Sequence, residues 1–305
     1  MKERNDINSE GNARSCLNAA PDTALPPNTD LDPYQKKTRR RKTAALFALI
    51  LLLALGILNN QGDYLGRDKS AAGQYLEVYS ACLLLLAYIV PFVIFMRWLC
   101  RRYKLRRIGL LLAAFCGAFI PTPFAGWLND DFTHMMSHWL GHSYSDDWMG
   151  SVEVGIVEEL LKLGTTALIL YVLEQRSLKN YISIGMSVGI GFQIEEDISD
   201  ITTAGFMHLN DAFPAALERV SGSLGSHWSY AAVTAAGLYL IVTAKGDKRK
   251  RLKGFGLIAL VMADHFAYDT PIGEINLFNA LLAVAVLLPL VLIIQSPEMK
   301  KESGE

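Results

Sequence analysis

Three ionisable side chains lie within an apolar stretch that is long enough to cross a bilayer. The stretch covers residues 151–174 and contains Glu158, Glu159 and Lys162 about two turns from its start. An ionisable group at depth in a membrane helix costs about 2.5–3.5 kcal/mol, so these three need partners, water or a function. In a helix Lys162 shares a face with Glu158 at i, i+4 and reaches Glu159 at i, i+3. We expect the lysine to neutralise one carboxylate and leave the second available for chemistry; a buried pair that only fixes helix register is the alternative.

Further carboxylates and imidazoles occur on three later apolar segments. They are Glu195, Glu196 and Asp197 in residues 181–199, His227 in residues 225–244, and His265 and Asp269 in residues 254–269. At about 1.5 Å per helical residue, all of these groups fall in the same outer half of the membrane as the first glutamate pair. Unpaired polar groups facing lipid would be costly, so we expect them to face one internal, water-accessible cavity.

Such a cavity would contain what hydrolysis by water requires. A glutamate takes a proton from water, while the imidazoles donate hydrogen bonds to the developing oxyanion or hold a metal ion that stabilises it. Each group also has a structural explanation when it is taken alone. His265 can be a hydrogen-bonding residue between helices, residues 195–197 the acidic end of a helix, and His227 a residue at headgroup level beside Trp228. Their conjunction at one depth favours a catalytic site.

The composition predicts an all-α fold, a polytopic membrane helix bundle. Of 305 residues, 51% are hydrophobic and only 19% are charged, and the apolar residues are gathered into long blocks. About eight transmembrane helices are expected, over residues 43–58, 74–95, 108–128, 151–174, 181–199, 225–244, 254–269 and 276–295. The four cysteines show no metal-ligand spacing, so neither a disulfide framework nor a zinc knuckle is predicted.

The basic residues predict the orientation of these helices. Clusters at residues 36–42, 97–107 and 245–253 lie beside apolar blocks, and by the positive-inside rule they stay in the cytoplasm. The acidic segment 129–150 contains no Lys or Arg and is expected to be an outer loop. Eight spans then place both termini in the cytoplasm of a multi-pass protein of the cell membrane. The juxtamembrane position of the first cluster favours this topogenic role over nucleic-acid binding, so no nucleic-acid partner is expected.

Four short motifs on separate predicted helices resemble the ordered motifs of the PrsW family of intramembrane proteases. They are VEELLK, with Glu158, Glu159 and Lys162; GFQIEED, with Phe192, Glu195 and Glu196; the segment from His227 to Gly237; and HFAYD, with His265 and Asp269. That family is distantly similar to the type II CAAX prenyl endopeptidases, which share a double glutamate on one helix and histidines on later ones. The resemblance covers residues 150–269, while the first three predicted helices match only in being hydrophobic.

The resemblance implies a catalytic site and a reaction. The residues that match the family motifs are Glu158, Glu159, Lys162, Glu196, His227, His265 and Asp269. The family tends to have Asn after the glutamate of the second motif, whereas here Asp197 follows Glu196 and Glu195 precedes it, so both glutamates remain candidates. The implied reaction is proteolysis of a membrane-anchored protein near the extracytoplasmic face, as in the release of a transcription factor from an anti-sigma-type partner.

The resemblance leaves the cofactor open. The family is often grouped with the metallopeptidases, which makes Zn²⁺ the candidate ion and Glu159, His227 and His265 its candidate ligands. A metal-free mechanism that depends on a glutamate is compatible with the same residue types.

We therefore predict an intramembrane endopeptidase that hydrolyses its substrate by glutamate-activated water. Its expected partners are a single-pass membrane protein substrate and the lipid bilayer. The alternative is a proton- or metal-coupled membrane transporter that uses the same carboxylates and histidines, although the inner halves of the later helices are nearly all apolar and offer no exit path. A scaffold that binds a partner helix without cutting it is a third hypothesis.

The predicted organisation has three parts. Residues 1–42 are expected to form a disordered cytoplasmic tail with a juxtamembrane basic cluster, residues 43–296 the transmembrane protease domain, and residues 297–305 a cytoplasmic C-terminal tail. Within the domain, Gly185 and Gly189 form a small-xxx-small pair that allows a neighbouring helix to approach closely.

A second group of histidines lies in the acidic outer segment. His134, His138 and His142 recur every four residues, so a helix would align them on one face. One hypothesis is a metal-binding or pH-sensing lid over the cavity. The other, which we favour, is an interfacial amphipathic helix whose Met135 and Trp139 rest on lipid.

Overall fold

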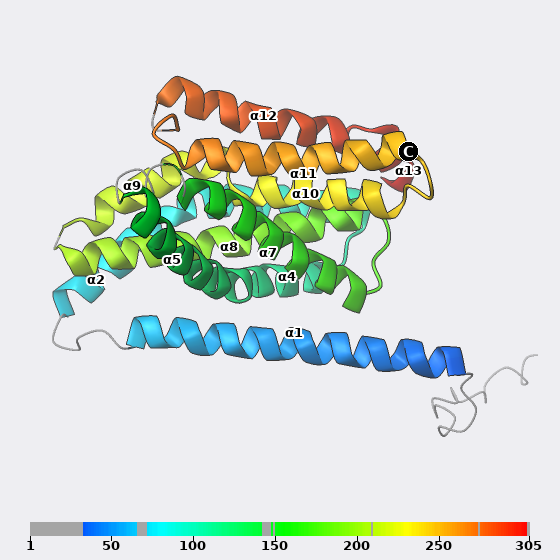
Figure 1. The fold of residues 1–305 in the computed structure, drawn as a ribbon, viewed down its shortest axis with the longest axis horizontal. Coiled ribbons are helices and arrows are strands. Elements are labelled where there is room, and N and C mark those ends of the chain that lie inside the picture. Colours follow the sequence, from blue (N-terminus) through cyan, green and yellow to red (C-terminus); the bar gives the residue numbers. More distant parts are fainter. Residues whose placement is uncertain are drawn as a thin grey trace, which may run out of the picture. The chain divides into compact units, whose positions relative to one another are not determined.

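The computed structural model describes residues 33–65, 72–141, 148, 150–208, 210–273 and 275–303. All regular elements among these residues are helices, which confirms the predicted all-α fold (Figure 1). The chain divides into two compact units, Met1–Arg41 and Lys42–Glu305, and every predicted site residue belongs to the second. The prediction of a disordered tail falls mostly on residues 1–32, which lie outside the described residues.

The helices follow one another with short connections. The first half contains α1 (Pro33–Leu65), α2 (Ala72–Cys82), α3 (Leu86–Tyr103), α4 (Arg107–Phe119) and α5 (Pro121–Leu140). The second half contains α7 (Gly150–Val172), α8 (Leu178–Met207), α9 (Ala212–Gly222), α10 (His227–Val242), α11 (Lys248–Tyr268), α12 (Asn276–Ile294) and α13 (Pro297–Ser303). Two 3₁₀ turns, Leu83–Leu85 and Ser223–Gly225, join α2 to α3 and α9 to α10.

In the part of the chain that the structure describes, four helical stretches are long and apolar enough to cross a membrane. They are Tyr34–Asn60 on α1, Ala72–Tyr103 across α2 and α3, Arg107–Trp139 across α4 and α5, and Asn276–Ile294 on α12. Large apolar side chains on these stretches are exposed, among them Leu55, Leu83, Leu111 and Leu288. Exposed apolar faces of this length fit a lipid environment, and the protein is a membrane protein.

Helix α8 is buried along most of its length. Its residues 182–193 are all buried, and it packs against α4, α7 and α10. The predicted glycine pair makes the contact with α10 possible. A Cβ on Gly185 would lie 2.4 Å from the carbonyl oxygen of Ala231, and a Cβ on Gly189 would lie 2.2 Å from that of His227. The two backbones therefore touch, which fixes the separation of the side chains that α8 and α10 bring to the site.

The C-terminal helix α13 holds the other end of α8. The carboxylate of Glu302 accepts hydrogen bonds from the backbone N–H groups of Leu178 (3.1 Å) and Lys179 (3.0 Å), the first residues of α8. These N–H groups have no partner within the helix, so an acceptor there stabilises the helix start. The segment expected to be a C-terminal tail thus anchors the helix that contains Glu196.

Several helix boundaries differ from the predicted spans for local reasons. The predicted third span divides into α4 and α5 at Pro121, whose ring nitrogen cannot donate the helical hydrogen bond. Helix α5 then continues to Leu140, through part of the expected outer loop. Helix α1 begins at Pro33, ahead of the predicted start at residue 43, because Lys and Arg favour helix. The amphipathic helix α9, of 11 residues, is too short to form an apolar block and is absent from the predicted spans.

Candidate active site

Lys162 lies at the centre of a buried charge network on α7. Its Nζ atom is 2.7 Å from Oε1 of Glu159 and 3.5 Å from Oε2 of Glu158, and all three side chains are buried. Both helical pairs expected from the spacing are present. The closer contact makes Glu159 the main partner of the lysine, while Glu158 is held more loosely. Lys162 also lies over the ring of Phe192 on α8, 4.2 Å from its centroid, in a cation–π contact.

His265 connects this network to α11. Its Nδ1 atom is 3.1 Å from Oε1 of Glu159. Its Nε2 atom faces two further carboxylates, Oε2 of Glu158 at 3.8 Å and Oδ2 of Asp269 at 3.3 Å. Asp269 follows His265 by four residues, so the predicted i, i+4 pair is formed. Three carboxylates from two helices therefore surround one imidazole.

His227, the first residue of α10, connects the lysine to α8. Its Nδ1 atom is 2.8 Å from Nζ of Lys162, and its Nε2 atom is 2.8 Å from Oε2 of Glu196. An ammonium group can only donate, so Nδ1 of His227 accepts and Nε2–H donates to Glu196. This pair of partners fixes the tautomer and the plane of the ring.

The structure separates the three consecutive acidic residues of α8. Glu196 faces the histidine of α10. Glu195 instead accepts a hydrogen bond of 2.5 Å from Nδ2 of Asn60 on α1, and Asp197 accepts one of 2.7 Å from the hydroxyl group of Tyr88 on α3. Of the two candidate glutamates, Glu196 is the one that joins the network around Lys162.

An arginine on α9 balances the acidic face of α8, and the sequence does not reveal this role. Arg219 forms ion pairs with Glu196 at 2.7 Å, Asp197 at 2.5 Å and Asp200 at 3.1 Å. A guanidinium group presents five donors in one plane, so it can contact several carboxylates at once. The only sequence signal is its charge, since Arg219 is one of the few basic residues that the predicted topology places outside.

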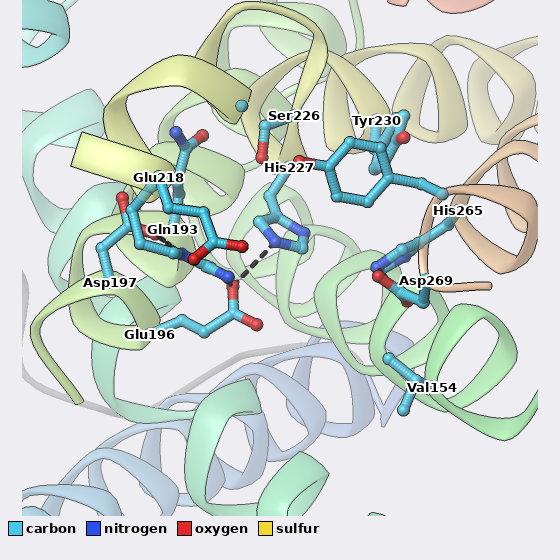
Figure 2. A pocket seen from close by; sticks show the side chains of 13 residues that line it. Val154, Gln193, Glu196, Asp197, Glu218, Ser226, His227, Tyr230, His265 and Asp269 are labelled. Carbon is cyan, nitrogen blue, oxygen red and sulfur yellow. Dashed lines mark hydrogen bonds and ion pairs between the residues drawn. The ribbon is translucent and has the colours of Figure 1, made fainter. Parts of the chain in front are cut away.

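Two cavities reach the network from different sides. The smaller one, of about 140 Å³, is lined by residues of α7 to α11, including Glu196, His227, His265 and Asp269, whose side chains Figure 2 shows around it. The larger one, of about 380 Å³, is lined by residues of α1, α5, α7 and α8. Glu158 and Glu196 line the larger cavity, whereas Glu159 and Lys162 line neither. Glu158 and Glu196 therefore face an internal cavity, whereas the Glu159–Lys162 pair is enclosed by protein.

Glu158, His227 and His265 form a group that could hold a metal ion. One donor atom from each lies within 4.8 Å of the others, and all three residues are buried. Two imidazoles and a carboxylate form a donor set typical of catalytic zinc sites. With Nδ1–H of His265 donating to Glu159, its Nε2 lone pair faces two carboxylates, an arrangement that a cation would satisfy. The sequence suggested Glu159 as the third ligand. In the structure the carboxylate that lies with the two imidazoles is that of Glu158, and Glu159 contacts Nδ1 of His265 instead.

The seven residues selected from the sequence thus lie in one contiguous network. They are Glu158, Glu159 and Lys162 on α7, Glu196 on α8, His227 on α10, and His265 and Asp269 at the end of α11. The histidines of the acidic outer segment are not part of it among the described residues: His134 and His138 are exposed on α5, and His142 lies outside the described residues. Both hypotheses for that segment stay predictions.

The fold and the site together define a polytopic helical membrane protein with a buried centre of carboxylates and imidazoles. The family model described as PrsW family intramembrane metalloprotease matches residues 106–294. The chain belongs to this family and is an intramembrane protease, which favours the predicted enzyme over the transporter and the scaffold. The match includes all seven site residues and extends beyond the motifs at 150–269 to α4, α5 and α12. No curated protein and no solved structure matches the chain.

Proposed function

We propose that Glu158 takes the proton from the attacking water when this protease hydrolyses a peptide bond. The two glutamates of α7 have different surroundings. Glu159 is paired with Lys162 at 2.7 Å, whereas Glu158 lines the larger cavity and lies with His227 and His265. A carboxylate that is open to a cavity and not neutralised at short range is the better proton acceptor. This difference is the main support for the proposal.

The proposed reaction is amide hydrolysis. As the water oxygen bonds to the carbonyl carbon of the substrate, one water proton moves to Glu158 and negative charge develops on the carbonyl oxygen. A doubly protonated His265 would donate to that charge from Nε2, which faces Glu158 and Asp269, while its Nδ1–H stays on Glu159. The C–N bond then breaks, and the leaving amine takes the proton that Glu158 held. The products are a carboxylic acid and an amine, and the carboxylate of Glu158 is regenerated.

Three further residues act through the histidines in this scheme. Glu159 accepts from Nδ1 of His265 and sets the orientation of that ring. Lys162 donates to Nδ1 of His227, and Glu196 accepts from its Nε2–H. We assign these three as positioning residues, because each contacts an imidazole through a hydrogen bond that selects one tautomer.

A divalent cation, with Zn²⁺ as the candidate, would be held by Glu158, His227 and His265, and Glu158 would then serve as a ligand in place of its role as proton acceptor. Such an ion, when bound, supplies a more acidic water and polarises the substrate carbonyl. Both nitrogen atoms of His227 already have partners, so binding the ion requires that ring to release Lys162 or Glu196. Metal analysis of the purified protein tests this assignment. About one zinc per chain, lost in His265→Ala, supports it, and full cleavage by metal-free protein in chelator contradicts it.

We infer a membrane-anchored protein as the substrate, of the single-pass kind and with an anti-sigma-type factor as one example. The larger cavity is lined by polar side chains that can pair with a peptide backbone, including Asn60, Thr122 and Asn129. A peptide needs such partners once it leaves a helix within a membrane. The charge pattern supports cleavage near the extracytoplasmic face of the cell membrane, with both termini of the protease in the cytoplasm.

Cleavage of a co-expressed single-pass reporter tests the role of Glu158. The reporter is the membrane protein that becomes shortened when proteomes with and without the protease are compared. Glu158→Gln is expected to lower cleavage by about 10²–10⁴-fold, the usual contribution of a general base. Glu153→Gln, one and a half turns earlier on the same helix and outside the network, is the matched control. Equal cleavage by Glu158→Gln and the wild type would remove Glu158 from the mechanism. Loss of cleavage in Glu159→Gln alone would make Glu159 the proton acceptor and Glu158 the positioning residue.

A further inference from the structure

A groove between α3, α4 and α8 takes no part in the site. It has a volume of about 320 Å³, and its wall is apolar, formed by side chains that include Phe92, Met96, Leu110, Ile190 and Ile194. The hydroxyl group of Ser187, which also lines it, donates to the carbonyl oxygen of Ser183 in its own helix and is thereby satisfied. The wall thus offers packing surface and no free polar partner along α8.

Among the described residues that line this groove, two arginines are the only charged ones. Arg97 comes from α3 and Arg107 from the start of α4, and both side chains are exposed. Within the described part of the chain neither forms an ion pair. Their charge is therefore available to a ligand that lies in the groove.

The charged and apolar parts of the groove are separated along its length. Arg97 follows Ile89 by eight residues on α3, a distance of about 12 Å along the helix. Arg107 begins α4 just after the turn that ends α3, so both arginines lie toward the basic turn between these helices. Ile89 on α3 and Ile194 on α8 lie toward the other end. A ligand that fits has an anionic head and an apolar chain about 12 Å long or longer.

We propose that this groove binds one anionic phospholipid from the leaflet that borders the basic turn. The two guanidinium groups hold its phosphate, for which planar paired donors are well suited. One acyl chain lies along the apolar wall between α3, α4 and α8. Anionic lipids are attracted to juxtamembrane arginines by about 1 kcal/mol per charge, which adds to the direct phosphate contacts.

The charge in the groove distinguishes a phospholipid from an apolar partner helix. A partner helix that is apolar at this depth would leave the guanidinium groups of Arg97 and Arg107 without an anion, whereas a phosphate group can pair with both. The groove also lies on α8, whose Ile190 and Ile194 face it while Glu196 faces the active site. The bound lipid would therefore pack against the helix that holds Glu196, and it should raise the thermal stability of the protein.

Native mass spectrometry of the full-length protein tests the proposal with two lipids that share the same acyl chains. The probes are palmitoyl-oleoyl phosphatidylglycerol and palmitoyl-oleoyl phosphatidylcholine. The wild type is expected to retain one phosphatidylglycerol and to lose phosphatidylcholine readily. The double variant Arg97→Gln/Arg107→Gln should bind phosphatidylglycerol about tenfold or more weakly. Arg101→Gln/Arg106→Gln removes the same charge from exposed arginines outside the groove and, because this experiment has no charged bilayer surface to attract, should stay within about twofold of the wild type.

A third variant tests the acyl chain separately. Ala114→Leu places extra volume in the groove and keeps both arginines, so it should also lose the lipid. Equal loss in the two arginine double variants would mean diffuse surface attraction and overturn the proposal. Equal retention of the two lipids, or full binding by Ala114→Leu, would overturn it as well. Unchanged lipid binding with reduced reporter cleavage in Arg97→Gln/Arg107→Gln would mean that a protein segment occupies the groove instead. None of these results depends on the role of Glu158.

Discussion

Helices α10 and α12 are both apolar in sequence and of similar length, yet they occupy opposite environments. Of the 16 residues of α10, the structure buries 11, whereas in the 19 residues of α12 only Val286 and Leu290 are buried. The two helices differ in the size of their side chains. Helix α10 reads HWSYAAVTAAGLYLIV and is rich in Ala, Gly, Ser and Thr, while α12 is rich in Leu and Val. Figure 1 shows α12 running beside α11, and α12 also packs against α10.

This difference shows that hydropathy identifies a membrane helix but does not place it. Lipid tails are as apolar as leucine, so burial of leucine brings no hydrophobic gain in a membrane. Close packing of small residues is what brings helices together, and the α8–α10 contact at Gly185 and Gly189 is of this kind. Helices α8 and α10, which meet so closely, also contain ionisable groups, because such groups need polar partners inside a membrane. Four substitutions, each with a matched comparison variant, test the contrast between this polar centre and the apolar periphery.

The largest effect on stability is expected from Lys162→Met. The variant removes a buried cation that contacts Glu159 at 2.7 Å and Glu158 at 3.5 Å, and it leaves buried carboxylates without that partner. Breaking a buried pair in this way costs about 3–5 kcal/mol. SDS titration in mixed micelles measures the loss of the folded state.

The double variant Lys162→Met/Glu159→Gln separates charge balance from function. It replaces the pair by neutral groups of similar volume, so most of the stability should return. Cleavage should stay low, because His227 loses the donor that orients it, and a neutral amide at position 159 accepts more weakly from His265 than the carboxylate does. Wild-type stability of Lys162→Met alone would show that the centre is not held by this ion pair.

The next effect is expected from Gly189→Ala, which tests close packing in the same region. The new Cβ would lie 2.2 Å from the carbonyl oxygen of His227, so α8 and α10 must separate. Overpacking costs about 1–3 kcal/mol, and here it also moves His227 relative to Glu196. Gly164→Ala on α7 is the control, because nothing lies within 4 Å of its Cβ position. Equal behaviour of the two alanine variants in SDS titration would contradict close contact of α8 with α10.

The sequence predicts the polar centre better than its exact contacts. Helical spacing and shared depth are enough to associate Glu158, Lys162, His227 and His265, because unpaired charges in a membrane leave few alternatives. The choice between neighbouring carboxylates is different. Adjacent residues on α8 point about 100° apart, so whether Glu195 or Glu196 faces His227 depends on the rotation of the helix. Packing against other helices sets that rotation, and no local pattern encodes it.

The helices outside the apolar blocks are the part that the sequence does not predict. Helix α9 lies between two predicted spans, and the partners of Arg219 are about twenty residues earlier on another helix. Neither helical nor strand periodicity relates such positions, so their contact follows only from the tertiary fold. Similarly, Glu302 is remote from Leu178 in sequence, and only the fold brings it to the start of α8.

A smaller effect, on activity, is expected from Arg219→Gln. The arginine contacts three carboxylates on α8 and is partly exposed, so water can replace part of its role. Without it Glu196 has one fewer partner and holds His227 less firmly. We expect reporter cleavage to fall about tenfold, within the range for loss of a supporting residue around a catalytic histidine. Arg219→Lys should recover only part of the activity, because an ammonium group cannot contact carboxylates in the same planar way.

Arg176→Gln, an exposed arginine after α7, is the control for this variant and should cleave at the wild-type rate. A purely structural role for Arg219 would lower the amount of folded protease in both Arg219 variants and leave the activity per folded molecule unchanged. Cleavage is therefore normalised to the folded fraction.

The smallest effect is expected from Leu288→Ala on α12, and it tests the apolar side of the contrast. Leu288 is 55% exposed and contacts lipid in the folded protein as it would in a separated helix. The free energy of unfolding should therefore change by less than about 0.5 kcal/mol in SDS titration. Met186→Ala, at a fully buried position of α8, should cost about 2 kcal/mol or more, because packing contacts are lost and a cavity remains. Similar losses of unfolding free energy at the two positions would mean that close side-chain packing holds α12, as it holds α10. The exposed face of α12 would then be covered by another part of the assembled protease.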